Sequence, residues 1–294
     1  MIAALKPKTL GVLGYFQPFL NADGLLESLP GWIFVEWSAA NDYVQDVSYP
    51  TNMVYAAALD AAGRLYDLPA LRTQAAQVRE AIRRLSFDGE FFTDNALRRD
   101  GALEKTTNRT EACQYYAFFC DVATPETYPA LWRILAEQFG PSRKQTGAYP
   151  EVGTANAFIG NYLRLELLSR YGLQRQMLDE SGDYLLYMAE RTGTLWENDG
   201  TQASCNHGFA AHIVHTLYRD VLGVAEISTQ AKTVRLHFAE LALVWCEGKM
   251  PLPDGILSLN WWTEGETLYY RANHPAGYTL TVENKSGKAL IRKA

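Results

Sequence analysis

The stretch 194–208 carries the residue types best suited to chemistry on a sugar. Glu197 directly follows Trp196 ahead of a glycine turn, and Asn206 and His207 then open an apolar stretch. An indole offers a flat apolar surface to the C–H face of a sugar, and a neighbouring carboxylate can act as base, acid or hydrogen-bond acceptor. The alternative is a Trp that packs on its own domain while Glu197 faces water, and these residues alone favour neither interpretation.

A second pattern places an acidic residue between two indoles. Glu36 lies between Trp32 and Trp37 in an aromatic-rich loop spanning residues 21–48. If the two Trp side chains line a cleft, Glu36 can bind sugar hydroxyls. Buried aromatic packing, with Glu36 accepting hydrogen bonds from backbone amides, explains the same spacing equally well.

Two further segments place an acidic residue near the start of a helix. Asn108 or Thr107 is predicted to cap one helix, with Glu111 as its capping-box partner. The functional alternative places Glu111 at the mouth of a site. The turn-rich loop 147–156, which contains Glu151, is either another loop at that mouth or a favourable negative charge at a helix start.

No metal or cofactor is expected. His207, His212 and His215 have the spacing of one helical face, but no acidic partner stands at the spacing of known zinc motifs. Cys205 and His207 form a Cys-x-His pair, which alone is a weak signal, and the four cysteines are expected to be reduced thiols. Motifs for nucleotide binding or an activated serine are absent from the sequence.

Composition limits the class of protein. The chain has 294 residues, 48% hydrophobic and 20% charged, as in an ordinary globular protein. The net charge of -6 argues against a nucleic-acid partner. No uninterrupted apolar run is long enough to span a membrane, and the residues after Met1 do not form a secretory signal, so a cytoplasmic location is expected.

Hydrophobic periodicity changes along the chain. About eight helices are predicted up to Gly223, near residues 9–20, 50–66, 69–85, 109–121, 127–139, 154–171, 174–191 and 206–222. A short hairpin is predicted at residues 87–92, around an Asp-Gly turn. After Gly223 apolar residues alternate with polar ones, and turn residues separate the runs, which predicts strands.

Helical hairpins with aromatic and acidic loops, followed by a β tail, predict a mainly helical fold class. We expect a partial (α/α)6-toroid catalytic domain at residues 1–223 and a small antiparallel β-sandwich at residues 224–294. A closed toroid of six hairpins needs about twelve helices, so about four are expected to be missing.

The order and spacing of these motifs resemble the C-terminal part of the bacterial α-L-rhamnosidases of glycoside hydrolase family 78. The resemblance covers nearly the whole chain, although no single motif is decisive. The matching segments are Trp32 to Trp37, Thr194 to Glu197, Asn206-His207-Gly-Phe, Leu217 to Gly223, Gly248 to Pro251 and Gly255 to Trp261.

This resemblance implies roles for the candidate residues. Glu197 takes the place of the general base that activates water, Trp37 that of the Trp that packs on rhamnose, and His207 that of the His that hydrogen-bonds the sugar. The loop between Glu197 and His207 is shorter than in many family members. Further substrate-binding residues are expected among their neighbours Glu36, Trp32, Trp196 and Asn206. The implied reaction is inverting hydrolysis of a terminal α-L-rhamnoside, without a metal, on a rhamnose-containing oligosaccharide or glycoside.

One departure from the family concerns the general acid. In the family this residue lies in a DCPxRER-like motif upstream of the Trp-rich loop, and the present sequence has no such motif. Inverting glycosidases need two carboxyl groups, so a truncated product with little activity of its own is expected. Helix faces meant for missing hairpins then predict self-association or binding of a missing N-terminal half.

Two other functions fit the same pattern. The chain can be a catalytically inactive module for carbohydrate binding or assembly. It can also be a different α/α-toroid enzyme, such as a glucoside hydrolase or a phosphorylase. A phosphorylase needs a phosphate pocket of grouped basic or hydroxyl side chains, and the sequence shows none.

Overall fold

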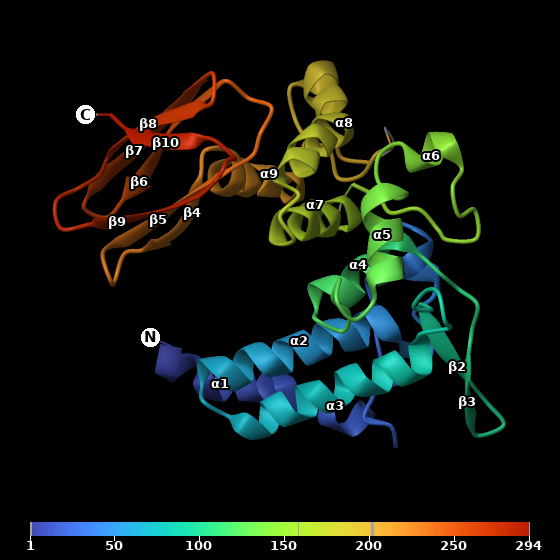
Figure 1. Cartoon of the computed structure of the whole chain (residues 1–294). Coiled ribbons are helices and arrows are strands. Elements are labelled where there is room, and N and C mark those ends of the chain that lie inside the picture. The colour runs from blue at the N-terminus through green and yellow to red at the C-terminus, as the bar shows by residue number, and fades with distance from the viewer. Residues whose placement is uncertain (1, 158, 201–202, 294) are drawn as a thin grey trace. The chain divides into compact units, whose positions relative to one another are not determined.

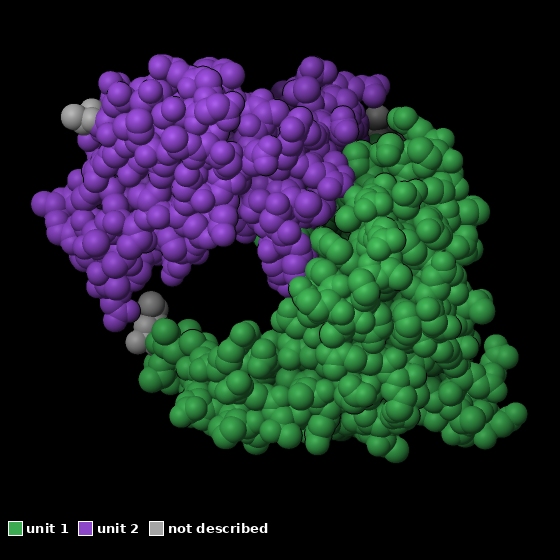
Figure 2. Space-filling view, viewed as in Figure 1, with its two compact units in different colours: residues 1–167, 198–202 green, residues 168–197, 203–294 purple. Residues whose placement is uncertain are grey.

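The computed structural model describes residues 2–157, 159–200 and 203–293, which form two compact units (Figures 1 and 2). Unit 1 comprises residues 1–167 and 198–202, and unit 2 comprises residues 168–197 and 203–294. No helix within the described parts of the chain has the length and apolarity needed to cross a bilayer.

Unit 1 is built mainly from helices. The helical segments before residue 168 are α1 (Ile2–Tyr15), η1 (Gln17–Phe19), η2 (Ala39–Asp42), α2 (Tyr49–Leu65), α3 (Pro69–Ser86), α4 (Glu111–Phe119), α5 (Pro129–Glu137), α6 (Arg143–Thr146) and α7 (Gly160–Arg170), whose last turn belongs to unit 2. Pro50 and Pro69 lie in the first turns of α2 and α3, where the missing N–H of proline costs nothing. Figure 1 shows these two helices side by side as a hairpin.

A small antiparallel sheet in unit 1 was not expected from the sequence. Its order is β1 (Val47–Ser48), β2 (Asn95–Arg99) and β3 (Ala102–Lys105). Asp100 and Gly101 join β2 to β3, and their φ angles of 47° and 82° suit a tight two-residue hairpin turn. The Asp-Gly dipeptide was therefore the available signal for this hairpin.

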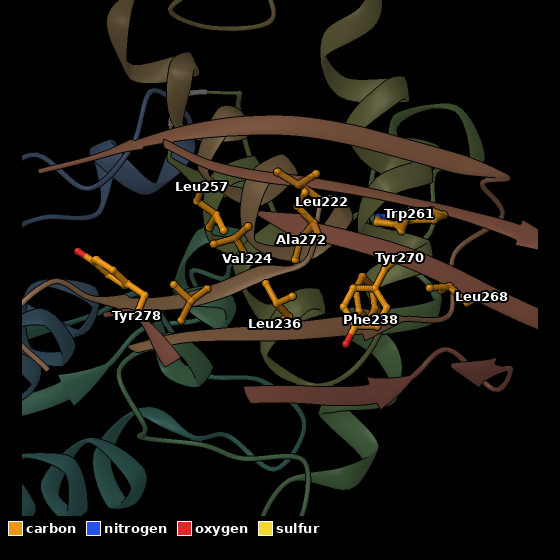
Figure 3. Packing of buried hydrophobic residues seen from close by; sticks show 12 residues of the cluster. Leu222, Val224, Leu236, Phe238, Leu257, Trp261, Leu268, Tyr270, Ala272 and Tyr278 are labelled. Carbon is orange, nitrogen blue, oxygen red and sulfur yellow. The ribbon is translucent and has the colours of Figure 1, made fainter. Parts of the chain in front are cut away.

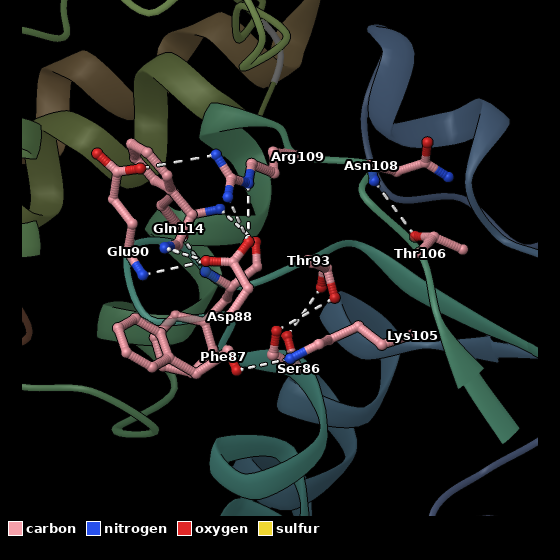
Figure 4. Close-up of polar contacts among 12 residues, drawn as sticks. Ser86, Phe87, Asp88, Glu90, Thr93, Lys105, Thr106, Asn108, Arg109 and Gln114 are labelled. Atoms are coloured by element: carbon pink, nitrogen blue, oxygen red, sulfur yellow. Dashed lines mark hydrogen bonds and ion pairs between the residues drawn. The ribbon is translucent and has the colours of Figure 1, made fainter.

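Polar contacts hold the predicted hairpin at residues 87–92 (Figure 4). The Asp88 carboxylate accepts hydrogen bonds from the backbone amides of Glu90 and Phe91 and from Nε of Arg109 at 2.8 Å. Lys105 Nζ donates to the Phe87 carbonyl oxygen at 2.8 Å. Phe87 and Phe92 pair across the turn, as the sequence predicts.

Unit 2 combines helices with two sheets. Its elements after α7 are α8 (Gln174–Thr192), η3 (Gly208–Ala211), α9 (His212–Thr216), the π-helical η4 (Leu217–Val221), β4 (Val224–Ser228), β5 (Thr233–Ala239), β6 (Trp245–Leu252), β7 (Gly255–Glu264), β8 (Thr267–Asn273), β9 (Thr279–Lys285) and β10 (Ala289–Arg292). One sheet has the order β10-β8-β7-β6 and the other β4-β5-β9. Strands β5 and β9, and β8 and β10, pair in parallel, so the expectation of purely antiparallel sheets is wrong.

The two sheets share one apolar core (Figure 3). In β5, β7 and β8 alternate residues are buried, which is the period of two expected for a strand with one buried face. Trp261 Nε1 also donates to the Val221 carbonyl oxygen at 3.0 Å and so ties the end of η4 to the sheet. The buried cluster consists of Leu222, Val224, Val234, Leu236, Phe238, Leu257, Leu259, Trp261, Leu268, Tyr270, Ala272 and Tyr278.

The change from helix to strand occurs where the sequence predicts it. Helical structure ends at Val221 and β4 begins at Val224, with Gly223 between them at a φ of 94°. Because Leu222 and Val224 belong to the same core, this junction lies inside unit 2. The toroid and the domain assignment of residues 1–223 and 224–294 remain predictions.

Three expected helices differ from their sequence-based bounds. The helix expected from residue 154 begins at Gly160, because residues 154–157 form a loop held by buried side chains described below. The helix expected at residues 206–222 is divided into η3, α9 and η4. The helix expected at residues 9–20 lies instead at Ile2–Tyr15, seven residues earlier at its start. The other five expected helices lie within a few residues of their predicted positions.

Gly223 provides a test of this junction. A Cβ at residue 223 would lie 2.8 Å from the His237 carbonyl oxygen, whereas one at Gly277, with a φ of 87°, would meet nothing within 4 Å. A left-handed φ costs a non-glycine residue about 1–2 kcal/mol in either place. We therefore expect Gly223→Ala to lower the free energy of unfolding more than Gly277→Ala, as measured by urea denaturation. Equal losses of unfolding free energy in the two variants would show that the close approach to the His237 carbonyl oxygen does not affect stability.

Candidate sugar-binding site

Three aromatic rings gather in the loop that precedes η2. The ring centroids of Trp32 and Phe34 lie 5.3 Å apart, those of Phe34 and Trp37 5.0 Å, and those of Trp32 and Trp37 5.9 Å. Trp37 is 39% exposed and Trp32 is 72% exposed. The two indoles that the sequence singled out therefore form one partly exposed aromatic cluster, with surface available to the apolar face of a sugar.

Glu36, in the same loop, is buried. It is 0% exposed, and its neighbours Val35 and Ala40 pack against Ala112 of α4. The carboxylate accepts hydrogen bonds from Ser38 Oγ at 2.7 Å and from the backbone amides of Asn156, at 3.0 Å, and Gly160. The expectation that Glu36 binds a sugar directly therefore does not fit its burial. The alternative, a carboxylate satisfied by backbone amides, describes its surroundings.

The approach of Glu36 to α7 requires a glycine. A Cβ at Gly160 would lie 2.5 Å from Oε1 of Glu36 and 2.4 Å from the Cβ of Ala155. Burial raises the pKa of Glu36 to about 7, although the hydrogen bonds from Ser38, Asn156 and Gly160 act in the opposite direction. Glu36 therefore acts as a structural acceptor that joins its own loop to the start of α7.

Asn156 makes contacts that the sequence analysis did not anticipate. Its Nδ2 donates to the Trp37 carbonyl oxygen at 2.6 Å, and its Oδ1 accepts from the backbone amides of Asp199 at 3.0 Å and Ala157 at 2.6 Å. Asp199 also pairs with Lys144. These contacts lie inside unit 1, and they link the Trp37 loop to the chain two residues beyond Glu197 in sequence.

A buried ion pair supports the loop that contains Ala155 and Asn156. Glu111 Oε1 lies 2.6 Å from Nη1 of Arg143, and Glu111 Oε2 accepts from the Ala155 amide at 2.7 Å. Thr110, rather than Asn108 or Thr107, caps α4 by accepting from the Cys113 amide. The predicted capping box is therefore wrong. Glu111 is 4% exposed, which also excludes a role at the mouth of a site.

A third buried carboxyl group, that of Asp94, lies near the Glu111–Arg143 pair. Asp94 is 1% exposed, and its Oδ1 accepts a hydrogen bond from Thr110 Oγ1 at 2.7 Å. Burial raises the pKa of Asp94 to about 7, and the negative charge of Glu36 adds to the effect. Unit 1 therefore holds two carboxyl groups whose protonated forms are favoured in the folded chain.

Trp196 belongs to the core of unit 2. It is 2% exposed, its Nε1 donates to Thr192 Oγ1 at 2.8 Å, and its ring meets Tyr187 edge-on at 5.6 Å. An indole packed in this way does not present its face to water. The surroundings of Trp196 fit the packing alternative, and its contact with substrate stays a prediction.

Glu197 and His207 lie on two segments that pair through their backbones. The Glu197 amide donates to the Ser204 carbonyl oxygen at 2.9 Å, and the His207 amide donates to that of Leu195 at 3.0 Å. Glu197 is half-buried, and its Oε2 accepts from the Ser204 amide at 3.3 Å. Residues 201 and 202, between the two segments, lie outside the described residues.

The His207 ring caps the helix that follows it. Nδ1 accepts a hydrogen bond from the Phe209 amide at 3.3 Å, so a neutral ring carries its proton on Nε2. Nε2 is then a donor of the kind that a sugar hydroxyl accepts. The adjacent Asn206 is exposed, and its amide donates to Ser204 Oγ at 3.4 Å.

Each unit thus holds part of the predicted site. Unit 1 brings together Trp32, Glu36 and Trp37, and unit 2 contains Trp196, Glu197, Asn206 and His207. A common cleft for Trp37, Glu197 and His207 remains a prediction. Within the described parts of the chain, no three His, Cys, Asp or Glu residues gather in a way that could hold a metal ion.

The two buried carboxyl groups predict a pH dependence of stability. Glu36 and Asp94 keep their protons in the folded chain up to about pH 7, whereas ordinary Glu and Asp release theirs near 4.5 and 3.8. The free energy of unfolding should therefore fall as pH rises from about 4.5 to 7, by up to about 1.4 kcal/mol per pH unit for each group. Glu36→Gln should make this fall shallower, measured by urea denaturation at several pH values.

Glu80 supplies the control for this experiment, because its side chain is 72% exposed. Glu80→Gln should leave the pH profile unchanged. If Glu36→Gln and the parent chain show the same slope between pH 4.5 and 7, the raised pKa of Glu36 is contradicted.

The chain was compared with protein families, curated proteins and solved structures. No family model and no curated protein matches the chain. The structure of a GH78-family rhamnosidase of Bacillus sp. GL1 is similar over 99% of this chain and 31% of that one, with a TM-score of 0.83 and 21% sequence identity.

Two further solved structures are similar over shorter ranges. A rhamnosidase from Klebsiella oxytoca with rhamnose bound matches 73% of this chain and 41% of its own, with a TM-score of 0.56 and 15% identity. An α-L-rhamnosidase from Dictyoglumus thermophilum matches 80% and 26%, with a TM-score of 0.56 and 13% identity. The chain thus spans less than half the length of each of these rhamnosidases. Its resemblance to the GH78 α-L-rhamnosidases, predicted from the sequence, is confirmed at the level of the fold.

Proposed function

We propose that this chain binds the terminal α-L-rhamnose of a glycoside, and that Glu197 is the general base of an inverting hydrolysis. The observation that carries the proposal is the likeness of nearly the whole chain to a GH78-family rhamnosidase, at a TM-score of 0.83. The motif residues support it further, because Trp37 is partly exposed and Glu197 and His207 are both only half-buried. Rhamnosidase activity is a property of the longer proteins and is here a proposal for this chain.

Each residue has a separate role in this proposal. Trp37 packs its indole against the apolar face of rhamnose, and His207 donates from Nε2 to a hydroxyl. Glu197 takes a proton from the water that attacks the anomeric carbon, and the configuration is inverted. Glu36 attaches the loop that carries Trp37 to residues 156 and 160, and Asn156 holds the Trp37 carbonyl, so neither needs to touch the sugar.

The general acid is the incomplete part of the mechanism. Inverting enzymes use a second carboxyl group about 6.5–9.5 Å from the base. Among the acids that the sequence offers as substitutes, Glu36 and Glu111 are buried and hold hydrogen bonds or an ion pair. Glu151 is exposed. A positioned general acid contributes about 10²–10⁴-fold to rate, so we expect slow hydrolysis by this chain alone.

The burial of Glu36 and Glu111 favours a second candidate function. If no accessible carboxyl group serves as acid, the chain binds rhamnose without cleaving its glycosides. Binding and turnover must therefore be measured separately.

Binding is tested by titrating the full chain with L-rhamnose, and with D-glucose as the competing sugar. We expect saturable binding of rhamnose and none of glucose at the same concentrations. Trp37→Ala should weaken rhamnose binding by about tenfold, the equivalent of about 1.4 kcal/mol. Trp245→Ala removes another exposed indole, in β6, and should change nothing. No rhamnose binding, or equal binding of glucose, would contradict the proposal.

Turnover is tested with an aryl α-L-rhamnoside. Slow release of the β-anomer, followed by NMR, is the expected result. Glu197→Gln should remove this activity while L-rhamnose still binds. Undiminished hydrolysis by Glu197→Gln would exclude Glu197 as the base, and binding without any hydrolysis by the parent chain would establish the second candidate.

A further inference from the structure

The outer face of the four-stranded sheet in unit 2 carries a row of aromatic side chains. Trp245 of β6 stands directly opposite Trp262 of β7, and Trp262 stands opposite Tyr269 of β8. The buried residues of β7 and β8 alternate with these positions, so the three rings lie on the face opposite the core. Because neighbouring strands are about 4.8 Å apart, this aromatic row is about 10 Å long, which is more than one pyranose ring.

The aromatic row has an open indole at one end and cations over its other two rings. Trp245 is 60% exposed, and its indole N–H has no hydrogen-bond partner among the described residues. The rings of Trp262 and Tyr269 stack with their centroids 5.6 Å apart. Arg271 lies over the Trp262 ring at 5.2 Å, and Lys293 lies over the Tyr269 ring at 4.4 Å. A ligand on this row therefore meets an apolar surface followed by positive charge.

A second row, of planar polar side chains, runs beside the aromatic row. Glu247 stands opposite Asn260, and Asn260 stands opposite Arg271, on the same three strands. Each lies two positions from the aromatic residue of its own strand and so faces the same side of the sheet. Within the described parts of the chain, none of these three side chains makes a hydrogen bond or an ion pair. A carboxylate, an amide and a guanidinium are therefore available to the polar groups of a ligand.

A saccharide suits the two rows better than a protein or a lipid surface does. A pyranose offers an apolar C–H face to an indole and hydroxyl groups to planar polar side chains. The core of a protein–protein interface is depleted of charge, whereas Arg271 and Lys293 lie over two of the rings. Glu247 and Glu264, on the same face, would repel an anionic membrane.

The charge of this face favours an acidic saccharide. The whole chain has a net charge of -6 and so repels polyanions in general. On the outer face of the sheet, however, the cations Lys249, Arg271 and Lys293 outnumber the acids Glu247 and Glu264. A guanidinium can pair with a carboxylate through two parallel hydrogen bonds, so Arg271 suits the carboxylate of a uronic acid.

We propose that this face of the sheet binds a chain of uronic acid residues. Trp245 packs on the C–H face of one sugar, Arg271 pairs with the carboxylate of another, and Asn260 binds hydroxyl groups. The sheet carries none of the residues proposed to contact rhamnose, so the proposal does not rest on the proposed function. A monosaccharide covers only one ring of the row and is not retained, so Trp245→Ala still serves as the control for rhamnose binding at Trp37.

The test is calorimetry on the full chain with hexagalacturonate and, as the matched neutral ligand, its fully methyl-esterified form. The acid should bind about tenfold more tightly than the ester, because esterification removes the charge that Arg271 and Lys293 meet. Trp245→Ala and Arg271→Gln should each weaken binding of the acid by about tenfold. Both side chains are exposed, so both variants should fold, which circular dichroism checks.

Two control variants match these changes. Ile256→Ala removes an apolar side chain that is 57% exposed on the same face, at the far end of β7 from Trp262. Arg99→Gln removes a cation whose side chain is 65% exposed in unit 1, and it changes the net charge as much as Arg271→Gln does. Both controls should bind hexagalacturonate as the parent chain does. Poly-L-glutamate, a polyanion without sugar rings, should not bind.

Each contrary outcome has a distinct meaning. No binding of hexagalacturonate, or binding that Trp245→Ala leaves unchanged, would overturn the proposal. Equal affinity for the methyl ester would overturn the assignment to an acidic sugar, and equal binding of poly-L-glutamate would reduce the site to charge alone. A dimer in size-exclusion chromatography that Trp245→Ala dissociates, without saccharide binding, would assign the face to a second copy of the chain. Since no rhamnoside is used, the proposed function stands or fails separately.

Discussion

The candidate site depends on a carboxylate that has been removed from water. Burying an ionised carboxylate is costly unless it is well hydrogen-bonded, and Glu36 meets this condition with Ser38 and the amides of Asn156 and Gly160. The cost is still visible in its pKa, which burial raises to about 7. These contacts join residues 36 and 160 across 124 positions of sequence. The loop that carries Trp37 is thereby attached to the start of a helix.

Other polar contacts extend this attachment. Asn156 connects the Trp37 carbonyl to Asp199, and the Glu111–Arg143 pair holds the loop that contains Asn156. Buried ion pairs contribute little net stability, but breaking one leaves an uncompensated charge, which strongly disfavours other arrangements. We infer that this network restricts the conformations of the Trp37 loop. A flat sugar-binding surface requires such restriction, because every degree of freedom lost on binding weakens affinity.

The sequence predicted regular elements better than it predicted side-chain environments. Helical spacing placed α2, α3 and α8 within a few residues, and the change of period located the junction at Gly223. The hairpin of β2 and β3 was missed, although Asp100-Gly101 signals it. The parallel pairing of β5 with β9 was also missed, since alternation shows which face is buried but not which distant strand lies alongside.

The sequence could not predict which candidate residues are buried and which are exposed. Trp37 and Trp196 are both Trp residues beside a Glu, yet one is 39% exposed and the other 2%. The difference arises from tertiary neighbours, such as Thr192 and Tyr187 around Trp196, and not from local sequence. Asn156 was overlooked because an Asn in a turn-rich loop has no signature until its partners are known.

The central claim is that a rigidly held Trp37 loop forms the platform for rhamnose. A crystal structure of the chain in complex with L-rhamnose tests this claim most directly. The account predicts the apolar face of the sugar against the Trp37 indole, with Glu36 buried and Asn156 still bonded to the Trp37 carbonyl. Rhamnose bound away from Trp37, or a Trp37 loop that rearranges and exposes Glu36 to the sugar, would contradict it.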